Sequence, residues 1–463
     1  MRITKATNKW FREQGHRLDC KPYMSGAIEA KLILESLSCK KRPLNECTLG
    51  GDAGIYHAGR EGRRWVTSEE FGIPFLGSSD ILKSDVSNLP LISKAQVGKT
   101  PAFIIKSSWT LVTRSGTIGR MVYSRPDMDG MACSEHVMRI IPDRTKIPPG
   151  YLFAYMNSKF GVPLVVSSTY GSIIQSIEPH HLSNIPVPKL TDVVENDIHE
   201  SIELAALKRT KASLLRNEIV ELVQSCVDLD MPETPNLAST ASSKNIGRRL
   251  DAFHFSSKVT TALEKMAGEN SAELGALVVD IFEPNRGKRF KVDDELYGVQ
   301  FLSSSDVFSL DPKGDYFIST AQTPNIDSLI VTENDLLIPR SGQLGGIIGK
   351  AVLPLPTYYG SAASEHLVRV RCHSREDAFY LWAILVTKAG YYSIIGTAFG
   401  SSIPSLDCAL IKNLQVPMVD EITRSKIVSC VDSYISSLTE AIKLERGAII
   451  KVERAIEAAA PKH

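Results

Sequence analysis

The spacing of apolar and polar positions changes once within each half of the chain. Short apolar stretches bounded by Gly, Pro or Ser come first, and three of them, Ala102–Ile105, Leu111–Thr113 and Val137–Ile141, are typical of β-strands. Two other segments, Gly26–Leu37 and Pro149–Gly161, have the spacing of helices. The pattern therefore predicts a mixed, strand-rich α+β globule in the first part of each half.

Each half then ends in a long segment with apolar residues at three- and four-residue spacing. The first row comprises Val194, Ile198, Ala205, Ala212, Leu215, Ile219, Leu222 and Cys226, with Ser201 and Lys208 as polar members. The second comprises Val428, Val431, Ile435, Leu438, Ile442, Ile449, Val452 and Ile456, interrupted only by Glu445. A helix of about 32 residues is about 48 Å long, more than a domain of this size usually covers. Helices packed on their own domains are the simpler alternative, but two matched helices favour an antiparallel coiled coil that acts as a spacer.

The two halves are copies of one unit, because their motifs recur in the same order. Leu18 and Leu250 are 232 positions apart, and Arg114 and Arg340 are 226 apart, so few residues are inserted or lost. The recurring pairs are Arg17-Leu-Asp19 with Arg249-Leu-Asp251, Phe75-Leu-Gly-Ser-Ser-Asp80 with Phe301-Leu-Ser-Ser-Ser-Asp306, Arg114-Ser-Gly with Arg340-Ser-Gly, Ser134-Glu-His136 with Ser364-Glu-His366, Pro149–Gly161 with Ala378–Gly390, and Val187-Pro188 with Val416-Pro417.

The repeat divides the chain into five segments. We expect a first domain over 1–190, its helix over 191–228, and a flexible linker rich in Pro, Ser and Thr over 229–248. A second domain over 249–418 and its helix over 419–460 follow. The two domains should share one fold, and their helices should pair.

Composition is that of a soluble globular protein, with 43% hydrophobic and 23% charged residues. A membrane role is not expected, because no run of about 18 apolar residues occurs and the amino terminus lacks an apolar signal core. The eight cysteines include no Cys-x-x-Cys pair, which indicates a reducing cytoplasm and no metal site.

The net charge is only +1, so any polyanion must bind local basic clusters, at Arg60-Glu-Gly-Arg63-Arg64 and Asn285-Arg286-Gly-Lys288-Arg289. Either cluster alone is more often a solvated loop.

Motifs of the common DNA-modifying enzymes are absent from the sequence. It has neither the Gly-rich cofactor loop and Asn/Asp-Pro-Pro-aromatic motif of a methyltransferase nor a P-loop. Asp19 with Glu29-Ala-Lys31 is a poor match to a magnesium-dependent nuclease, because residues 26–37 look helical and Thr261 replaces Glu29 in the second half. We therefore expect a chain that is not an enzyme, has no catalytic residues and carries no cofactor itself.

Two polar motifs present in both halves have competing interpretations. On a strand, Ser134 and His136 would share a face while Glu135 pointed away, so the acid could not orient the imidazole, and a structural role is favoured over hydrolysis. The Arg-Ser-Gly-x-x-Gly turns offer donors suited to phosphate oxygens, and their glycines allow close approach of a surface. A plain β-turn with a salt-bridged Arg is the alternative for these turns.

Taken together, the chain resembles the specificity subunit of type I restriction-modification systems over nearly its whole length. The resemblance is carried by Arg114-Ser-Gly-Thr-Ile-Gly119 and its copy, by Tyr170-Gly-Ser-Ile-Ile-Gln-Ser-Ile177 before Ile185-Pro-Val-Pro188, by Phe399-Gly-Ser-Ser-Ile-Pro-Ser405 before Leu414-Gln-Val-Pro417, and by the helices that follow. It implies two target-recognition domains in inverted orientation, separated by a two-helix coiled coil, each reading one half-site of double-stranded DNA.

The resemblance also implies partner subunits. Two methyltransferase subunits would bring S-adenosylmethionine, and motor-nuclease subunits that use ATP and magnesium would join where restriction accompanies methylation. The chain departs from the simplest family pattern in its short first helix and in the extension before Arg17. A related phage-defence complex, a self-contained modification enzyme and a protein-only adaptor are the alternatives.

Comparison of the two copies separates scaffold from sequence reader, because two half-sites normally differ. Residues that differ at matched places, such as Arg60 and Arg63 against Asn285 and Lys288, Thr117 against Gln343, and Gln175 against Pro404, are candidates for base contacts. The full set expected at DNA is Arg60, Arg63, Arg64, Arg114, Ser115, Thr117, His136, Ser172, Gln175, Arg286, Lys288, Arg289, Arg340, Ser341, Gln343, His366 and Ser401. The set expected in the coiled coil and at partner subunits is Ile198, Leu215, Ile219, Leu222, Val431, Ile435, Leu438, Ile442, Ile449 and Val452.

Overall fold

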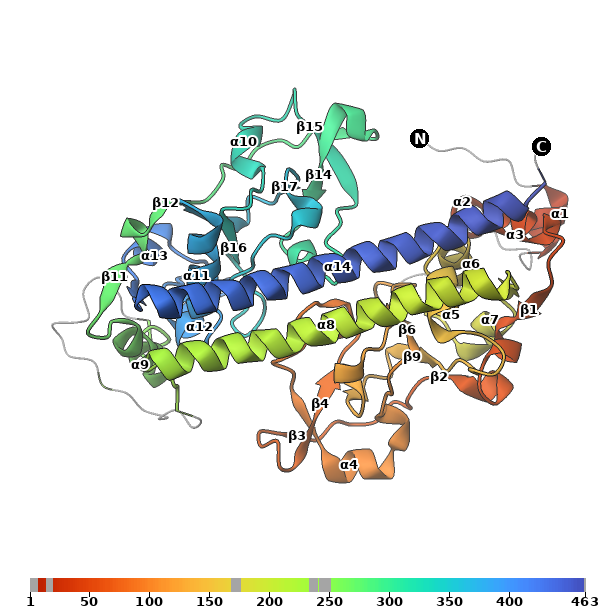
Figure 1. Ribbon diagram of the computed structural model, residues 1–463, viewed down its shortest axis with the longest axis horizontal. Coiled ribbons are helices and arrows are strands. Elements are labelled where there is room, and N and C mark those ends of the chain that lie inside the picture. The colour runs from red at the N-terminus through yellow and green to blue at the C-terminus, as the bar shows by residue number, and fades with distance from the viewer. Residues whose placement is uncertain (1–6, 14–19, 168–175, 233–239, 241–250, 462–463) are drawn as a thin grey trace. The chain divides into compact units, whose positions relative to one another are not determined.

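A computed structural model describes residues 7–13, 20–167, 176–232, 240 and 251–461. The chain forms two compact units: unit 1 combines Met1–Thr210 with Glu440–His463, and unit 2 is Lys211–Thr439. The long helices α8 (Asp192–Cys226) and α14 (Glu421–Ala459) each contribute to both units (Figure 1). Most of the linker expected over 229–248 lies outside the described residues.

Unit 1 has three small sheets in its described part. The first pairs β1 (Lys41–Pro43) antiparallel with β10 (Pro186–Pro188). The second has the order β2-β9-β6-β7, from β2 (Ile55–Tyr56), β9 (Val137–Ile140), β6 (Thr110–Thr113) and β7 (Met121–Tyr123). The third has the order β3-β5-β4-β8, from β3 (Trp65–Val66), β5 (Leu91–Ser93), β4 (Gly72–Leu76) and β8 (Ala132–Cys133).

Unit 2 repeats this arrangement in the residues that the structure describes. It pairs β11 (Ser271–Glu273) with β19 (Gln415–Pro417). Its second sheet has the order β12-β18-β16, from β12 (Val278–Phe282), β18 (Leu367–Cys372) and β16 (Asp335–Pro339). Its third has the order β13-β15-β14-β17, from β13 (Lys291–Val292), β15 (Tyr316–Ser319), β14 (Gly298–Leu302) and β17 (Ala362–Ala363). The expected α+β class with two repeated strand-rich domains is confirmed.

Shorter helices flank the sheets. In unit 1 they are α1 (Asn8–Glu13), α2 (Lys21–Met24), α3 (Ala27–Ser36), α4 (Lys94–Lys99), α5 (Pro149–Met156), α6 (Gly161–Ser167) and α7 (Pro179–Ser183). In unit 2 they are α9 (Ser257–Met266), α10 (Ile326–Leu329), α11 (Arg375–Leu385), α12 (Lys388–Ile395) and α13 (Cys408–Lys412). The 3-10 helices are η1 (Leu44–Cys47), η2 (Gly51–Gly54), η3 (Asp80–Leu82), η4 (Pro101–Phe103), η5 (Pro126–Met128), η6 (Leu274–Ala276), η7 (Glu295–Tyr297), η8 (Asp306–Phe308) and η9 (Pro356–Tyr358).

Several local predictions differ from the structure. The helix expected over Gly26–Leu37 and the strands expected over Leu111–Thr113 and Val137–Ile141 are confirmed as α3, β6 and β9. Residues 102–105 do not form a strand, because Pro101 starts the 3-10 helix η4 there. The helices expected over 149–161 and 378–390 each break in two. A Cβ on Gly161 or Gly390 would lie 2.4 Å from a carbonyl oxygen of the preceding helix, so glycine permits this tight turn.

The main core of unit 1 joins distant parts of the chain. All eight residues of α5 are buried, and the last six, 151–156, share one apolar cluster with Ile198 and Ile202 of α8 and Val452 and Ile456 of α14. A separate small cluster lies under the third sheet, around Phe75, Ile92 and Phe103. Unit 2 has the equivalent cluster around Phe301, Ile318 and Leu329. Each unit thus contains a small outer lobe with its own core.

The two long helices pair antiparallel. In unit 1, Lys451 Nζ lies 2.7 Å from Asp197 Oδ2, and Lys208 Nζ lies 2.5 Å from Glu440 Oε2, so the partner number on α14 falls as the number on α8 rises. In unit 2, burial and then the nearby charge of Glu218 on α8 raise the pKa of the Cys430 thiol on α14. This antiparallel pairing agrees with the expected coiled coil.

The row of apolar residues predicted along α8 is only half right. Ile198, Ala205, Ala212 and Ile219 are buried as expected, but the second row lies one residue further along than predicted. That second row contains Glu195, Ile202, Arg209 and Val223, all buried, whereas Leu215 and Leu222 are half-buried. On α14, Val431, Ile435, Leu438, Ile442 and Val452 are buried and Ile449 is half-buried.

An ion pair explains the error in that row. Arg209 is 2% exposed, and its guanidinium donates to both carboxylate oxygens of Glu445, at 2.8 and 2.6 Å. Glu445 is the residue that interrupts the apolar row of α14. The spacing of apolar residues cannot identify Arg209, because a charged side chain occupies the buried row only where it has a partner of opposite charge.

The described helices lack the features of a single membrane-spanning helix. None of them, taken singly, combines sufficient length with sufficient apolar character. Only α11 and α12 reach both when taken together, and these two helices are bent by 90° relative to each other. Every residue of α11 from Ala378 to Leu385 is buried in the fold.

Candidate nucleic-acid interface

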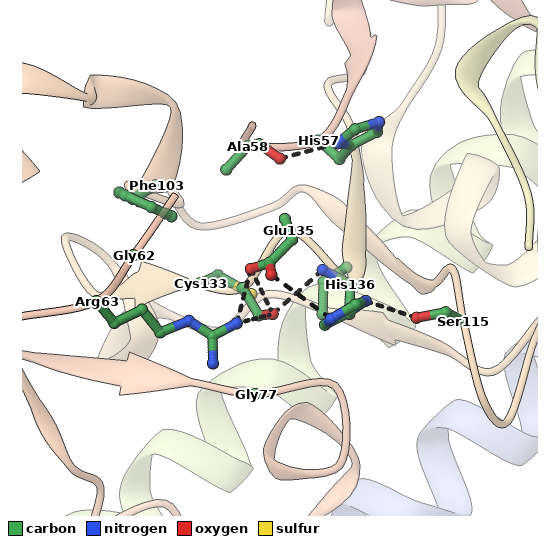
Figure 2. A network of polar contacts seen from close by, with 12 residues as sticks. His57, Ala58, Gly62, Arg63, Gly77, Phe103, Ser115, Cys133, Glu135 and His136 are labelled. Carbon is green, nitrogen blue, oxygen red and sulfur yellow. Dashed lines mark hydrogen bonds and ion pairs between the residues drawn. The ribbon is translucent and has the colours of Figure 1, made fainter. Parts of the chain in front are cut away.

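In both units, an arginine just before the edge strand of the third sheet contacts a glutamate and an aromatic ring. We call this pair of contacts the arginine clamp. In unit 1, Arg63 Nη2 lies 2.7 Å from Glu135 Oε2 (Figure 2). The guanidinium carbon of Arg63 lies 4.9 Å from the ring centre of Phe75. In unit 2, Arg289 Nη2 lies 2.6 Å from Glu365 Oε1, and its guanidinium carbon lies 4.3 Å from the ring centre of Phe301. The same charge pair and cation–π contact therefore occur twice.

The clamp corrects the matching of the two basic clusters. Arg63 corresponds to Arg289, 226 positions later, and not to Lys288. Strand pairing gives the same offset, because Trp65 faces Ile92 and Lys291 faces Ile318. Arg60 then corresponds to Arg286 and not to Asn285. Several basic residues lie close together in both clusters, so charge alone could not fix this register.

The clamp also lowers the pKa of its two glutamates, Glu135 and Glu365. Burial would raise the pKa of Glu135, but the hydrogen bond and charge of Arg63 outweigh burial, and the pKa lies below its usual value. For Glu365, burial is again outweighed, here by backbone hydrogen bonding and by Arg289, and the pKa is lowered. Both carboxylates are ionised partners of a fixed cation at neutral pH.

The Ser134-Glu135-His136 segment is a turn between β8 and β9, not a strand. The expectation that the acid cannot reach the imidazole is therefore wrong: His136 Nε2 lies 3.5 Å from Glu135 Oε1. The other ring nitrogen, Nδ1, lies 2.7 Å from Ser115 Oγ, so serine, imidazole and carboxylate form a chain (Figure 2).

This chain of contacts is not repeated in unit 2. There Ser341 Oγ pairs with Ser405 Oγ at 2.7 Å. What the two units share is a backbone contact, in which the amide of His136 donates to Ser134 Oγ at 3.1 Å and that of His366 donates to Ser364 Oγ at 3.2 Å. Because Arg63 also holds the Glu135 carboxylate, the shared role of the triplet is structural.

A buried arginine explains why this turn has the same form in both units. Arg139 and Arg369 are fully buried, and each guanidinium donates to backbone carbonyls of the turn. Arg139 Nη1 donates to the carbonyls of Ser134 and Val137 at 2.9 and 2.6 Å, and Arg369 Nη1 donates to those of Ser364 and Leu367 at 3.4 and 2.8 Å. Fixed carbonyls around a buried cation make the turn rigid.

The arginines of the Arg-Ser-Gly turns are held by acids. Arg114 donates to the Ile177 carbonyl at 3.0 Å and forms an ion pair with Glu178, while Arg340 Nη1 lies 2.6 Å from Glu283 Oε1. These arginine side chains are 15% and 19% exposed. A phosphate would have to compete with these carboxylates. At the same turns, Thr117 and Gln343 are exposed.

The other predicted DNA-binding residues differ in how far they are exposed to solvent. Ser115 and Ser341 are half-buried, whereas His366 and Ser401 are exposed. Ser172 and Gln175 lie outside the described residues, so their expected contacts have no counterpart here.

Exposed cations that form no ion pair with the described residues lie close in sequence to the clamp in both units. Arg60, Arg64 and Arg286 are exposed. In unit 1, Arg64 lines a hollow of about 370 Å³ together with Glu61, Gly62, Ala95, Gln96 and Lys99. Gln96 fixes this wall, because its Oε1 accepts from the Arg64 amide at 2.8 Å and its Nε2 donates to the Gly62 carbonyl at 2.5 Å.

Unit 2 presents a different surface at the same place. Lys288 lies over the ring of Phe290 at 4.9 Å, and Lys291 lies over Tyr316 at 3.9 Å. At the corrected register, Gly62, Arg64 and Trp65 of unit 1 stand where unit 2 has Lys288, Phe290 and Lys291. The clamp is shared, whereas the exposed side chains around it differ. The set expected from the sequence includes Arg286, Lys288 and Arg289 at this place, but it does not include Trp65, Phe290 or Lys291.

Some solved structures are similar to this chain, at low sequence identity. No protein-family model and no curated protein matches the chain. Similar solved structures include the type I restriction-modification S subunit from M. genitalium, with 11% identity, 92% of this chain and 97% of that chain covered, and a TM-score of 0.39. The HsdS subunit from Thermoanaerobacter tengcongensis has 15% identity, coverage of 91% and 97%, and a TM-score of 0.29. A chain from an assembly study of the type I system has 14% identity, coverage of 91% and 96%, and a TM-score of 0.30.

Proposed function

We propose that this chain is the non-catalytic specificity subunit of a type I restriction-modification complex or a related phage-defence complex. Each unit reads one half-site of a bipartite DNA target. The paired helices hold the two readers and bind methyltransferase subunits, which carry S-adenosylmethionine. Motor-nuclease subunits that use ATP and magnesium join the complex where restriction accompanies methylation.

The observation that carries the proposal is the comparison of the two edge strands. Both units keep the clamp and one exposed, unpaired cation, Arg60 or Arg286, at matched positions. The residues between and after these cations differ in size, charge and aromatic character. Shared cations suit the sugar-phosphate backbone, which is the same at both half-sites, and divergent neighbours suit different bases.

The helices fit the role of a spacer with docking sites. The paired helices have 35 and 39 residues, and in unit 1 the buried Arg209–Glu445 pair fixes their register. A chain that only bound one partner protein would have no use for two units with matched scaffolds and different exposed faces.

The proposal is tested by mapping methylated adenines in cells that express this chain together with its methyltransferase subunits. We expect one bipartite motif whose two parts are separated by a gap of fixed length. Methylation that is independent of this chain, or a motif without a gap, would contradict the proposal.

A second measurement separates the enzyme alternative. The purified chain alone is incubated with labelled S-adenosylmethionine and duplex DNA. We expect neither cofactor binding nor methyl transfer without partner subunits. Transfer by the isolated chain would identify a self-contained modification enzyme.

A further inference from the structure

Each unit carries an exposed aromatic side chain at the tip between the first two strands of its third sheet. Phe71 in unit 1 is 59% exposed, and Tyr297 in unit 2 is 68% exposed. They occupy matched positions, because each directly precedes the glycine that starts β4 or β14, and those glycines face Ser93 and Ser319 in the strand register. In unit 2 the neighbouring Leu296 is 82% exposed. We define the acid–aromatic tips as residues 69–71 and 293–297.

Acidic residues precede the aromatic side chain in both tips. Glu69 and Glu70 in unit 1, and Asp293, Asp294 and Glu295 in unit 2, are all exposed. Within the described part of the chain none of the five forms an ion pair. Two unrelated surface loops would hardly acquire the same combination at the same position of two units with different sequences.

Both tips are held in shape by hydrogen bonds. In unit 1 the Lys94 amide donates to the Phe71 carbonyl at 2.8 Å, and Lys94 Nζ donates to the Glu70 carbonyl at 2.8 Å. In unit 2 the Asp294 carboxylate accepts from the Leu296 amide at 2.9 Å. A side chain presented on an ordered turn loses little conformational entropy when it enters a partner's pocket.

The charge of the tips identifies the class of partner. Carboxylates concentrated around an exposed ring repel the phosphates of DNA, so these tips are poor DNA contacts although they belong to the DNA-reading units. A protein pocket with an apolar floor and a rim of Lys or Arg complements both the ring and the acids.

We propose that the acid–aromatic tips dock the methyltransferase subunits, one subunit on each unit, through such a basic-rimmed pocket. This inference rests on the proposed function and adds a second contact to the one proposed for the helices. A partner held at both the helices and a tip is fixed in orientation as well as in position. Because the tips are equivalent, they account for binding of two copies of the same subunit.

The test uses the purified full chain and the purified methyltransferase subunit, with binding measured by titration and stoichiometry by native mass spectrometry. Phe71→Ala should weaken binding of one of the two copies roughly 10- to 100-fold, as loss of a central aromatic contact does. Tyr297→Ala should weaken binding of the other copy, and the double variant should weaken both. Glu69→Gln with Glu70→Gln should make binding to unit 1 less sensitive to salt.

Matched controls are Leu49→Ala in unit 1 and Val279→Ala in unit 2, because these apolar side chains are 59% and 57% exposed but lie outside the tips. Binding equal to that of the controls in every tip variant would overturn this inference and leave the proposed function intact. A loss of DNA affinity with unchanged subunit binding would also overturn it. A wild-type chain that binds no methyltransferase subunit would overturn both proposals.

Discussion

The arginine side chains differ in environment, and the environment of each indicates its role. Arg139 and Arg369 are fully buried and hold backbone carbonyls. Arg63 and Arg289 are partly exposed but paired with acids. Arg60 is exposed and has no ion pair in the described residues. A basic cluster in a sequence therefore contains groups that build the fold as well as groups that are free to meet a ligand.

The free cations should contact phosphates. Arg60→Ala or Arg286→Ala should reduce the slope of log affinity against log salt by about one unit, and should weaken binding to all duplexes alike. The measurement is a salt titration on a cognate and a scrambled duplex. Arg114→Ala provides the comparison: because Glu178 already pairs with Arg114, its effect on the slope should be smaller. An equal effect would return Arg114 to the set of phosphate contacts.

The divergent residues should read bases. Arg64→Ala or Gln343→Ala should cost about 1 to 3 kcal/mol on the proper site and relax preference at one base position. Arg63→Ala should instead lower the stability of unit 1 and leave base preference unchanged, because the Arg63 guanidinium already contacts Glu135 and Phe75 within the fold. Methylation mapping of the three variants distinguishes these outcomes. Relaxed preference in Arg63→Ala would show that the clamp opens on DNA.

The clamp acids predict a pH dependence of stability. Because the folded-state pKa of Glu135 and Glu365 lies below the unfolded value, their contribution is fully present above the unfolded pKa. It is lost as the pH falls through the folded pKa. Glu135→Gln should therefore destabilise the protein in urea unfolding at about pH 7, and the difference from wild type should shrink as the pH falls through the lowered pKa of Glu135. A difference that does not change with pH would assign the effect to packing.

At the scale of elements, the buried ion pair between the long helices can be tested by a double-mutant cycle. Arg209→Leu alone leaves Glu445 without its partner and should cost about 3 to 5 kcal/mol, whereas Arg209→Leu with Glu445→Leu should be close to neutral. Thermal unfolding followed by circular dichroism gives the measurement. Additive losses would mean that the two charges are not coupled in solution.

Sequence periodicity predicted whole elements better than single positions. The apolar row of α14 was found because nearly all its members are aliphatic. Half of the α8 row was missed because Arg209 and Glu195 are charged and buried, and a charge becomes compatible with burial only through a partner distant in sequence. The same limit explains the mismatched basic clusters, since Arg63 and Arg289 are identified by acids 72 and 76 positions away.

At the scale of the whole molecule, the repeat predicts modular recognition. Replacing residues 17–190 by the equivalent domain of another such subunit should change one half of the methylated motif and leave the other half and the gap unchanged. Methylation mapping of the chimaera provides the measurement. A change in both halves would mean that the two units do not read DNA independently.

Unit 1 is discontinuous in sequence, and this has a consequence for biosynthesis. Its main core needs Val452 and Ile456, which the ribosome adds some 250 residues after Ile198 and Ile202, the side chains they cover. Unit 2 is one continuous stretch, so all its parts leave the ribosome before the last part of unit 1 does. The unit whose synthesis begins first is thus the unit completed last. A premature stop codon shortly before Val452 would damage recognition of the half-site that the amino-terminal half of the gene specifies.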